Sequence, residues 1–210
     1  MKNINLTLCL CLLHFCTISQ INLDLKNKLD SIQKIDQYFR DEVHHVMSNQ
    51  KYSDSLSRTE GFVMSEYVKD MMLKQELIDR NNINFIDSII KIYGYPGLSL
   101  VGESTCQTAW NIIQHSYEID NYYRLIRNAS RHGEIPDSLF AKTQDRFLIN
   151  SEKKQIYGTQ ADCTPNASGS FNCIILPIRN IKNVNKRRKK AGFLETIEEY
   201  AKNNGYQLNN

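Results

Sequence analysis

Apolar residues recur at alternating steps of four and three positions after the first twenty residues, which is the spacing of one helix face. This stripe consists of Leu25, Leu29, Ile32, Phe39, Val43 and Val46. It predicts an amphipathic helix of about six turns. Asp36 stands at a stripe position where an apolar residue is expected. A carboxylate there must find a partner or shift its pKa, because burying an unpaired charge is costly.

Helical patterns continue along most of the chain. The polar segment 51–58 is expected to separate the first helix from the second, and Asn82 is expected to cap the start of the third. Two glycines and a proline within residues 94–97 end the helical pattern, and it resumes near Glu103. Helices are expected over residues 25–46, 60–79, 82–93, 103–117, 120–131, 136–148, 183–191 and 194–203.

Two short runs near the C-terminal end favour strands, residues 155–160 and 172–177. The loop between them is rich in Pro, Asn, Ser and Gly, which predicts a β-hairpin. Because the ordered pattern runs from residue 23 to 206 without a linker, residues 20–210 are predicted to form a single domain. The expected fold class is mainly α, a multi-helix domain with a small C-terminal β-hairpin.

Residues 1–19 have the layout of a cleaved secretory signal peptide. Lys2 precedes an apolar stretch, and small residues stand before Gln20, where cleavage is expected. The stretch is shorter than a membrane-spanning helix, so no membrane span is expected after cleavage. A buried first helix is the alternative. A lipid anchor on Cys16 is disfavoured because His14 and Phe15 stand where small residues would be needed. The protein is therefore expected in the periplasm or outside the cell.

Export to an oxidising compartment would allow the cysteines to form a disulfide. Three of them, Cys106, Cys163 and Cys173, remain after the leader. An oxidising compartment favours a bridge, and Cys163 and Cys173 flank the loop of the expected hairpin, whose paired strands would bring them together. We expect a Cys163–Cys173 disulfide and a free Cys106 on the core-facing side of its helix. The alternative is that both hairpin thiols stay reduced.

Charge and motif spacing exclude several kinds of partner. Residues 20–210 hold 25 basic and 23 acidic residues, too even a balance for a protein whose main partner is nucleic acid. The basic run 186–190 also has no aromatic residues that could stack on bases. No cysteine pair stands at metal-ligand spacing with a histidine, so neither a metal nor a cofactor is expected.

His115 is the first candidate for chemistry. On its predicted helix it lies opposite Trp110 and Ile113, with Gln114 on the flank, so it does not fill the core behind the tryptophan. It faces either solvent or a second surface, where the imidazole needs a partner. A solvated or structural histidine is the ordinary alternative to a catalytic or binding role.

Two charged residues are further candidates. Glu134 follows Gly133 in a tight turn and could point into a cleft, although a carboxylate in the first turn of a helix also suits the helix dipole. Arg187 shares a helix face with Val184 and Ala191. It is therefore expected to be more buried than the neighbouring lysines, and to pair with a buried carboxylate or bind an anion.

The order of these motifs resembles an uncharacterised bacterial family of unknown function. The motifs are Ile113-Gln114-His115, Gly133-Glu134, Asp145-Arg146, Gln155-x-Tyr157-Gly158-Thr159-Gln160, Pro177-Ile178 and Arg187-Arg188, and Asp36-Gln37 and Gly102 also fit. The resemblance implies no activity or cofactor. It implies that the polar residues of these motifs lie together, so Gln114, His115, Glu134 and Gln160 are expected around one polar cleft.

Two functions fit these residues. The first is a binding or interaction module of the cell envelope, with a ligand or envelope protein held by Asp36, Gln114, Gln160 and Arg187. The second is a hydrolase-like enzyme with His115 as general base, oriented by Glu134 or Asp36, and Arg187 holding an anionic group. Cys106 is a poor nucleophile for His115, because the two side chains point to opposite sides of the helix.

Overall fold

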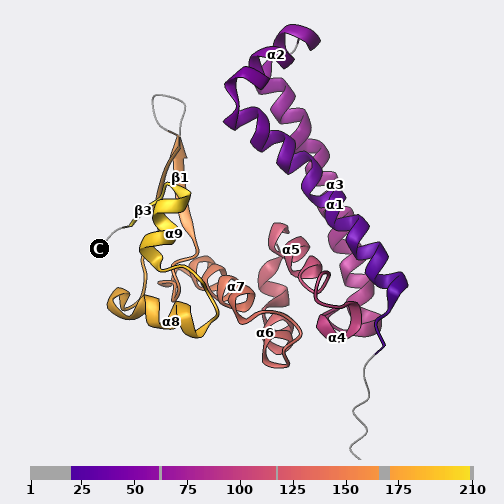
Figure 1. Cartoon of the computed structure of the whole chain (residues 1–210), viewed down its shortest axis with the longest axis vertical. Coiled ribbons are helices and arrows are strands. Elements are labelled where there is room, and N and C mark those ends of the chain that lie inside the picture. Colours follow the sequence, from indigo (N-terminus) through magenta and orange to yellow (C-terminus); the bar gives the residue numbers. More distant parts are fainter. Residues whose placement is uncertain (1–19, 62, 117, 166–170, 209–210) are drawn as a thin grey trace, which may run out of the picture.

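The structure is a computed structural model that describes residues 20–61, 63–116, 118–165 and 171–208 (Figure 1). It is mainly α-helical with a small sheet near the C-terminal end, so the predicted fold class is confirmed. The predicted leader, residues 1–19, lies outside the described residues. Within the described ranges, no helix combines the length and the apolar character needed to cross a membrane.

The N-terminal third of the chain forms a long helical hairpin (Figure 1). Helix α1 (Leu23–Ser48) and helix α3 (Met64–Tyr93) lie side by side, and the short helix α2 (Gln50–Glu60) joins them at the far tip. The apolar stripe of α1 packs against α3, so the first predicted helix is confirmed.

Two predictions for this hairpin are wrong. The polar segment 51–58 is helical, within α2, because Asn49 accepts a hydrogen bond from the Tyr52 backbone N–H and no Gly or Pro interrupts the helix. The helices expected over 60–79 and 82–93 are one continuous helix, α3. Asn82 does not cap a helix start, and its side chain is instead buried against α1.

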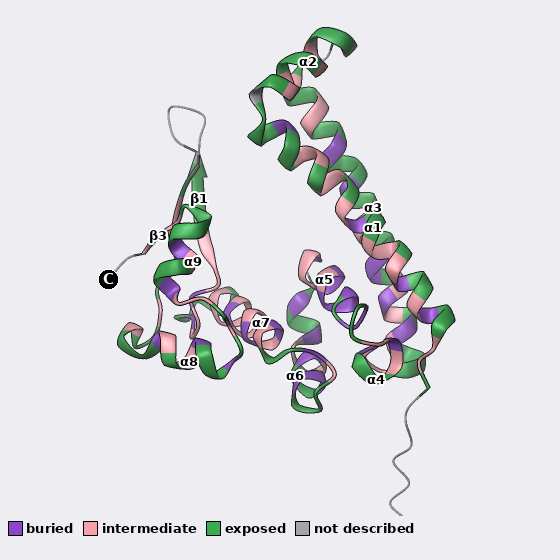
Figure 2. Cartoon of the chain, in the orientation of Figure 1, coloured by how far each residue is buried: buried purple, intermediate pink, exposed green. Residues whose placement is uncertain are grey.

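The middle of the chain packs short helices against the base of the hairpin. They are α4 (Leu98–Val101), α5 (Thr108–His115), the 3₁₀ helix η1 (Ile119–Tyr122), α6 (Tyr123–Arg131) and α7 (Asp137–Asn150). Leu29, Ile86, Ile113 and Ile126 are among the fully buried residues of the core they share. The Trp110 indole N–H donates to Thr143 Oγ1 over 2.9 Å and ties α5 to α7. Buried residues gather at this base, whereas the tip of the hairpin is mostly exposed (Figure 2).

The C-terminal unit has its own smaller core. It contains β1 (Ala161–Pro165), β2 (Phe171–Ile175), the 3₁₀ helix η2 (Ile181–Asn183), α8 (Val184–Lys190), α9 (Ile197–Asn204) and β3 (Gln207–Leu208). Strand β2 pairs with β1 antiparallel and with β3 parallel. Ile175, Val184, Ile197 and Ala201 form the buried centre beneath this sheet. A single domain over residues 20–210 stays a prediction, since the described residues form two apolar cores that α7 connects.

The predicted hairpin exists, but its first strand begins later than expected. Gln155 forms only an isolated bridge with Ile178, and residues 156–160 form a loop, because the carboxylate of Asp145 takes the backbone N–H groups of Ile156, Tyr157 and Thr159. The first strand is β1. Backbone donors held by that carboxylate cannot pair in a strand ladder. The second strand, β2, begins one residue before the predicted run 172–177 and ends two residues before the run does.

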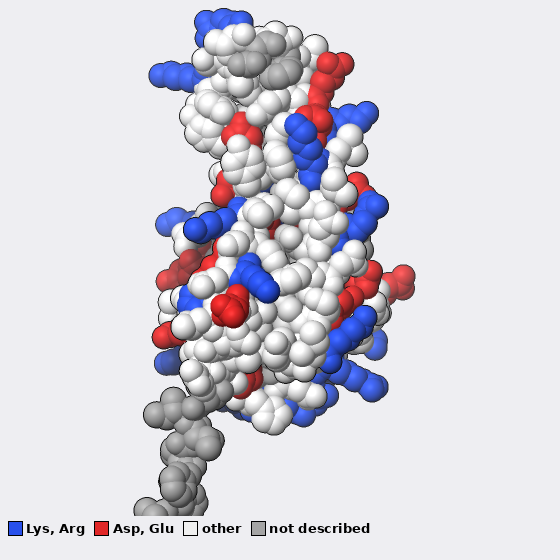
Figure 3. Space-filling model, turned by 90° about the vertical axis from the view of Figure 1, so that its right-hand side faces the viewer, with Lys and Arg blue, Asp and Glu red and all other residues white. Residues whose placement is uncertain are grey.

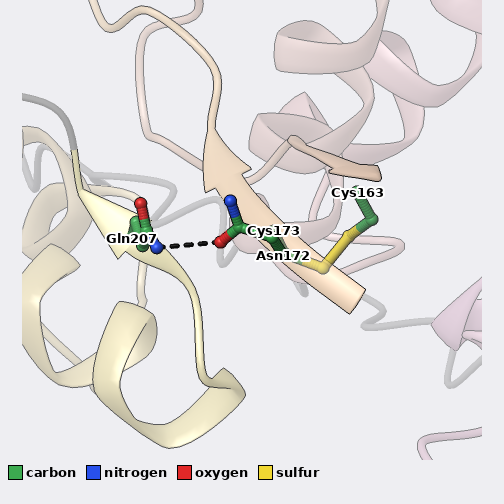
Figure 4. The surroundings of a disulfide bond; sticks show 4 residues. All are labelled: Cys163, Asn172, Cys173 and Gln207. Atoms are coloured by element: carbon green, nitrogen blue, oxygen red, sulfur yellow. Dashed lines mark hydrogen bonds between the residues drawn. A yellow bond between two sulfur atoms is a disulfide. The ribbon is translucent and has the colours of Figure 1, made fainter. Parts of the chain in front are cut away.

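The Cys163–Cys173 disulfide is confirmed. The two residues are register partners in β1 and β2, with their α-carbons 4.0 Å apart (Figure 4). The neighbouring Asn172 accepts a hydrogen bond from Gln207 Nε2 over 2.8 Å, which links β2 to β3. Cys106 is a free, buried thiol, as predicted.

Candidate functional site

The carboxylate of Asp36 is completely buried between α1, α3 and α5. Oδ2 lies 2.9 Å from Nδ1 of His115 and accepts a hydrogen bond from Gln37 Nε2 over 2.7 Å. Oδ1 accepts a bond from Asn82 Nδ2 over 3.3 Å. Arg40 Nε lies 3.8 Å from Oδ2. The polar gap in the stripe of α1 is therefore where three helices meet through side-chain hydrogen bonds.

Asp36 is ionised in this setting. Burial acts to raise the pKa of its carboxyl group, because a low dielectric disfavours the charged form. The hydrogen bond and charge of His115, together with Arg40 and Asn82, outweigh burial and hold the pKa below its usual value. The site thus keeps a buried negative charge beside an imidazole.

His115 connects this charge to the surface. Its side chain is 27% exposed, and it is the last residue of α5. When the imidazole is neutral, its Nδ1–H donates to Asp36 and its lone pair lies on Nε2. Nε2 makes no hydrogen bond to any residue that the structure describes, so the ring presents an acceptor outward.

His115 opens onto a cleft of about 1150 Å³ between the hairpin and the ends of α5 and α7. We refer to it as the His115 cleft. One part of its wall is apolar and consists of Phe39, Val43, Val68, Met72, Leu73 and Ile83. The charged residues that line the cleft are Arg40, Lys69, Glu76, Asp79, Arg80, Glu118 and Arg146. The cleft therefore has both an apolar wall and a polar end of mixed charge.

A second set of hydrogen bonds forms the polar floor of the cleft. Gln75 is buried, and its Nε2 donates to the backbone carbonyl of Asp36 over 3.1 Å and to Asp79 Oδ1 over 2.7 Å. Arg40 also binds Asp79 through Nη2. Gln75 Oε1 and Arg40 Nε are buried and have no hydrogen-bond partner among the residues described. A buried acceptor without a partner is costly, so the floor retains capacity for a bound donor.

Gln114 and Arg146 complete the polar end. Arg146 Nη1 donates to the backbone carbonyl of Gln114 over 2.8 Å, which joins α7 to the end of α5. Both residues line the His115 cleft. Of the four residues expected around one cleft, Gln114 and His115 line it, and Asp36, a possible partner of His115, contacts the imidazole.

Glu134 does not join this group, contrary to expectation. Its Oε2 accepts from the backbone N–H of Ser99 over 2.9 Å, and its Oε1 accepts from the Ser99 hydroxyl over 2.7 Å. The carboxylate therefore binds the first turn of α4, where a negative charge suits the helix dipole. Of the two carboxylates considered as partners of His115, the structure places Asp36 in contact.

Gln160 is also elsewhere. Its backbone N–H donates to Gln155 Oε1, and its backbone carbonyl accepts from Gln155 Nε2, both over 2.9 Å. The Gln160 side chain bonds to Thr159 Oγ1 over 3.2 Å. Gln160 therefore belongs to the loop around Asp145 and does not line the His115 cleft.

Arg187 is more buried than Lys186, Lys189 and Lys190, as predicted, but its expected carboxylate partner is wrong. Its guanidinium donates to three backbone carbonyls, those of Ile156, Arg179 and Asn180. These bonds clamp the loop at 156 to the segment before η2. Arg187 also lies outside the His115 cleft.

The buried arginine of α8 is the next residue, Arg188, which is 1% exposed. Positions three and four after Val184 both lie near its helix face, and Arg188 takes the inward one. It donates to the carbonyls of Tyr157 and Glu195 and stacks on the rings of Phe193 and Tyr200. The sequence pattern identified an inward arginine but assigned it to the wrong neighbour.

The pattern also missed Gln75 and Asn82. Together with Met71, Ile86 and Ile89 they lie on the buried face of α3, separated by helical spacings. Two amides in a buried stripe, facing the one acidic gap in the stripe of α1, are a signal that could have been found. In the described parts of the chain, no group of three or more His, Cys, Asp or Glu side chains could hold a metal ion.

Comparison with known proteins gives the class of the chain. Residues 58–208 match the model of a family of unknown function, DUF6624. The chain belongs to this family. The match includes His115, Gln75 and Arg146 but not α1, so Asp36 lies outside the segment that identifies the family. No curated protein and no solved structure matches the chain.

Proposed function

We propose that the protein is an exported binding module of the bacterial cell envelope, and that its ligand occupies the His115 cleft. The observation that carries the proposal is a cleft of about 1150 Å³ whose polar floor has one unpartnered acceptor, Gln75 Oε1, and one unpartnered donor, Arg40 Nε, beside an apolar wall. Binding sites commonly combine a mostly apolar concave surface with a few fixed polar groups. The Cys163–Cys173 bridge supports the export part, since disulfides persist in oxidising compartments.

The chemistry of the floor indicates what such a ligand carries. Gln75 Oε1 and, in the neutral ring, His115 Nε2 are acceptors without a partner among the described residues, and Asp79 adds a carboxylate that bonds to Gln75 Nε2. A ligand that donates hydrogen bonds at one end, such as an amide or hydroxyl compound, satisfies these acceptors. Its other end is apolar and packs against Val68 and Met72.

The test is a ligand screen on residues 20–210, with short apolar peptides, amides and sugars as probes. Each hit is expected to raise the melting temperature, because a ligand that binds only the native state stabilises it. Binding is expected to fall about tenfold or more in His115→Ala and Gln75→Ala. The matched control is His132→Ala, which changes an exposed histidine that directly follows α6 and does not line the cleft, and this variant keeps full affinity. Hits that bind His115→Ala as tightly as the parent protein place the ligand elsewhere.

A specific observation favours a second function, a hydrolase-like enzyme. The 2.9 Å contact between His115 Nδ1 and Asp36 is the arrangement by which a carboxylate orients an imidazole as general base. In this function Nε2 removes a proton from a water molecule as the water attacks the substrate. Arg146, which lines the cleft and donates to the backbone carbonyl of Gln114, takes the anion-holding role that was expected of Arg187.

Asp36→Asn separates the two functions. The amide fills the same space but no longer fixes the imidazole tautomer. In an enzyme, turnover falls by about 100-fold or more while ligand affinity changes little. A panel of ester, amide and phosphoester substrates is assayed with the parent protein, Asp36→Asn and His115→Ala. Turnover that is equal in all three variants rules out a general base at His115.

A further inference from the structure

Charge is divided unevenly along the chain. Residues 20–150 contain 15 basic and 18 acidic residues, whereas residues 151–210 contain 10 basic and 5 acidic residues. On the face of α1 and α3, positive and negative side chains are interspersed (Figure 3). The near-neutral balance of the whole chain therefore conceals a positively charged C-terminal unit.

Much of this positive charge lies on η2, which contains Lys182, and on the exposed side of α8, which contains the other three lysines. Lys182, Lys186, Lys189 and Lys190 are all exposed, at steps of three and four positions. They point away from the buried face formed by Val184. None of the four lysines forms an ion pair in the described part of the chain. The consecutive helices η2 and α8 thus present four exposed lysines without an ion-pair partner among the described residues.

The acidic residues nearest in sequence are held on the flank of α8. Glu195 Oε1 accepts a hydrogen bond from Asn203 over 2.7 Å, and Glu198 Oε2 accepts from Asn185 over 2.8 Å. These amides fix the two carboxylates on the side where α8 meets α9. The lysine face is therefore left without a neutralising carboxylate in contact.

A fully exposed leucine follows the lysines. Leu194 is 102% exposed, the highest value among the large apolar residues described. The loop that presents it is held on both sides, because Phe193 packs under the guanidinium of Arg188 and the Glu195 carbonyl accepts from Arg188 Nε over 2.9 Å. Leu194 is therefore a large apolar side chain held in water in the loop that directly follows the lysines of α8.

We propose that Lys182, Lys186, Lys189, Lys190 and Leu194, together called the α8 surface, dock on a bilayer of anionic phospholipid. The lysines contact headgroup phosphates, and Leu194 enters the boundary between the headgroups and the acyl chains. Clusters of four or more basic residues are attracted to anionic leaflets, and an apolar side chain adds insertion to that attraction. A soluble polyanion satisfies the lysines but gives no role to the leucine.

Docking by this surface leaves the His115 cleft accessible. Helix α8 lies along the outer edge of the C-terminal unit, remote from the long hairpin (Figure 1). The inference is independent of the proposed function, because neither Leu194 nor any of the four lysines lines the cleft.

Vesicle sedimentation tests the proposal with residues 20–210, since both apolar cores consist of residues after Gln20. Vesicles of phosphatidylcholine with an equal share of phosphatidylglycerol are compared with pure phosphatidylcholine vesicles. The protein is expected to sediment only with the anionic vesicles, and less as salt is added. The variant Lys182→Gln, Lys186→Gln, Lys189→Gln, Lys190→Gln is expected to bind about tenfold or more weakly.

The matched control removes the same charge elsewhere. Lys28, Lys34, Lys51 and Lys91 are also exposed, but they lie on the long hairpin. Changing these four to Gln is expected to leave vesicle binding nearly unchanged. An equal loss in both quadruple variants, each checked for folding by its far-UV spectrum, means that only net charge matters and overturns the proposal.

Leu194→Ser distinguishes a bilayer from other anions. This variant is expected to bind anionic vesicles about threefold or more weakly, while its binding to soluble polyphosphate stays the same. If Leu194→Ser binds both anionic vesicles and polyphosphate as tightly as the parent protein does, the surface is a general polyanion-binding patch, and the bilayer assignment is overturned. Absence of sedimentation with anionic vesicles overturns it as well.

Discussion

Asp36 and Asp145 are both completely buried carboxylates, but their hydrogen-bond donors differ in kind. Asp145 accepts from the backbone N–H groups of Ile156, Tyr157 and Thr159, at most 14 positions away in sequence. Asp36 accepts from side chains on three helices, the most distant being His115, 79 positions away. One carboxylate is thus enclosed by its local loop, and the other is assembled from distant parts of the chain.

This difference in donors distinguishes Asp145, which stabilises the fold, from Asp36, which contacts a residue of the His115 cleft. Backbone amides do not titrate, and burial raises the pKa of Asp145 despite its several donors. None of the groups that bond to Asp145 lines the His115 cleft. Asp36, in contrast, touches an imidazole whose other nitrogen opens onto that cleft. A buried charge therefore indicates function only when a partner links it to an accessible surface.

The largest expected effect is that of Asp145→Ala. Removing this carboxylate leaves the N–H groups of Ile156, Tyr157 and Thr159 without an acceptor. We expect the free energy of unfolding to fall by about 3–5 kcal/mol, measured by urea denaturation. Asp162→Ala, an exposed carboxylate on β1, is the control and costs less than about 0.5 kcal/mol. Similar losses in the two variants contradict a structural role for Asp145.

The disulfide gives the next largest effect. Replacing Cys163 and Cys173 by Ser is expected to lower the free energy of unfolding by roughly 2–3 kcal/mol, because the bridge closes a short loop. The effect is confined to the C-terminal unit, so the NMR signals of His115 stay unchanged. Adding reductant lowers the stability of the parent protein and leaves that of the double variant unchanged. A shift of the His115 signals in the double variant shows that the two regions are coupled.

Asp36→Asn has a smaller effect, and it depends on pH. We expect a loss of roughly 1–2 kcal/mol at neutral pH, since several charge-assisted hydrogen bonds weaken. The pKa of Asp36 is lower in the folded protein than in the unfolded chain. Its contribution is therefore fully present above the unfolded value and is lost as pH falls through the folded one. The difference between parent and variant shrinks below about pH 4.

Denaturation curves from neutral to acid pH measure this convergence. Gln37→Glu is not a suitable control because it adds charge beside Asp36, whereas Asp41→Asn removes an exposed carboxylate from the same helix. The Asp41 variant is expected to follow the parent protein closely at every pH. A gap between parent and Asp36→Asn that widens in acid contradicts the lowered pKa.

Arg187→Ala gives the smallest effect. Three carbonyl groups lose a charged donor, but the site is partly exposed and water replaces it. We expect a loss of about 1 kcal/mol in urea denaturation. Lys189→Ala, on the exposed face of α8, changes stability by less than about 0.5 kcal/mol. A loss as large as that of Asp145→Ala reveals a buried anionic partner of Arg187 after all.

Local patterns in the sequence predicted part of this structure. The stripe of α1, the position of Asp36 within it and the cysteine pairing each follow from a repeat or a turn a few residues long. The hydrogen-bond donors of Asp36 could not be predicted from the sequence. Helical periodicity shows that a helix face is buried, but it does not show which other helix covers that face. Only the fold brings Asn82 and His115 to Asp36.

The strand prediction for residues 155–160 is wrong for a different reason. Residues 155–160 have the composition of a strand, but Asp145 takes their backbone N–H groups. Strand propensity does not include such a competitor, which lies on the preceding helix. The same loop holds Gln160 away from the cleft. The expectation from the family resemblance therefore combined residues from two separate sites, the His115 cleft and the loop around Asp145.

The central claim is that Asp36 fixes His115 with Nε2 presented to the cleft as an acceptor. Nitrogen NMR of the imidazole, recorded above about pH 8 where a free histidine is neutral, tests it directly. The account predicts a His115 ring protonated at Nδ1 in the parent protein and a mixture of tautomers in Asp36→Asn. A ring protonated at Nε2 in the parent protein, or the same tautomer mixture in both proteins, would contradict it.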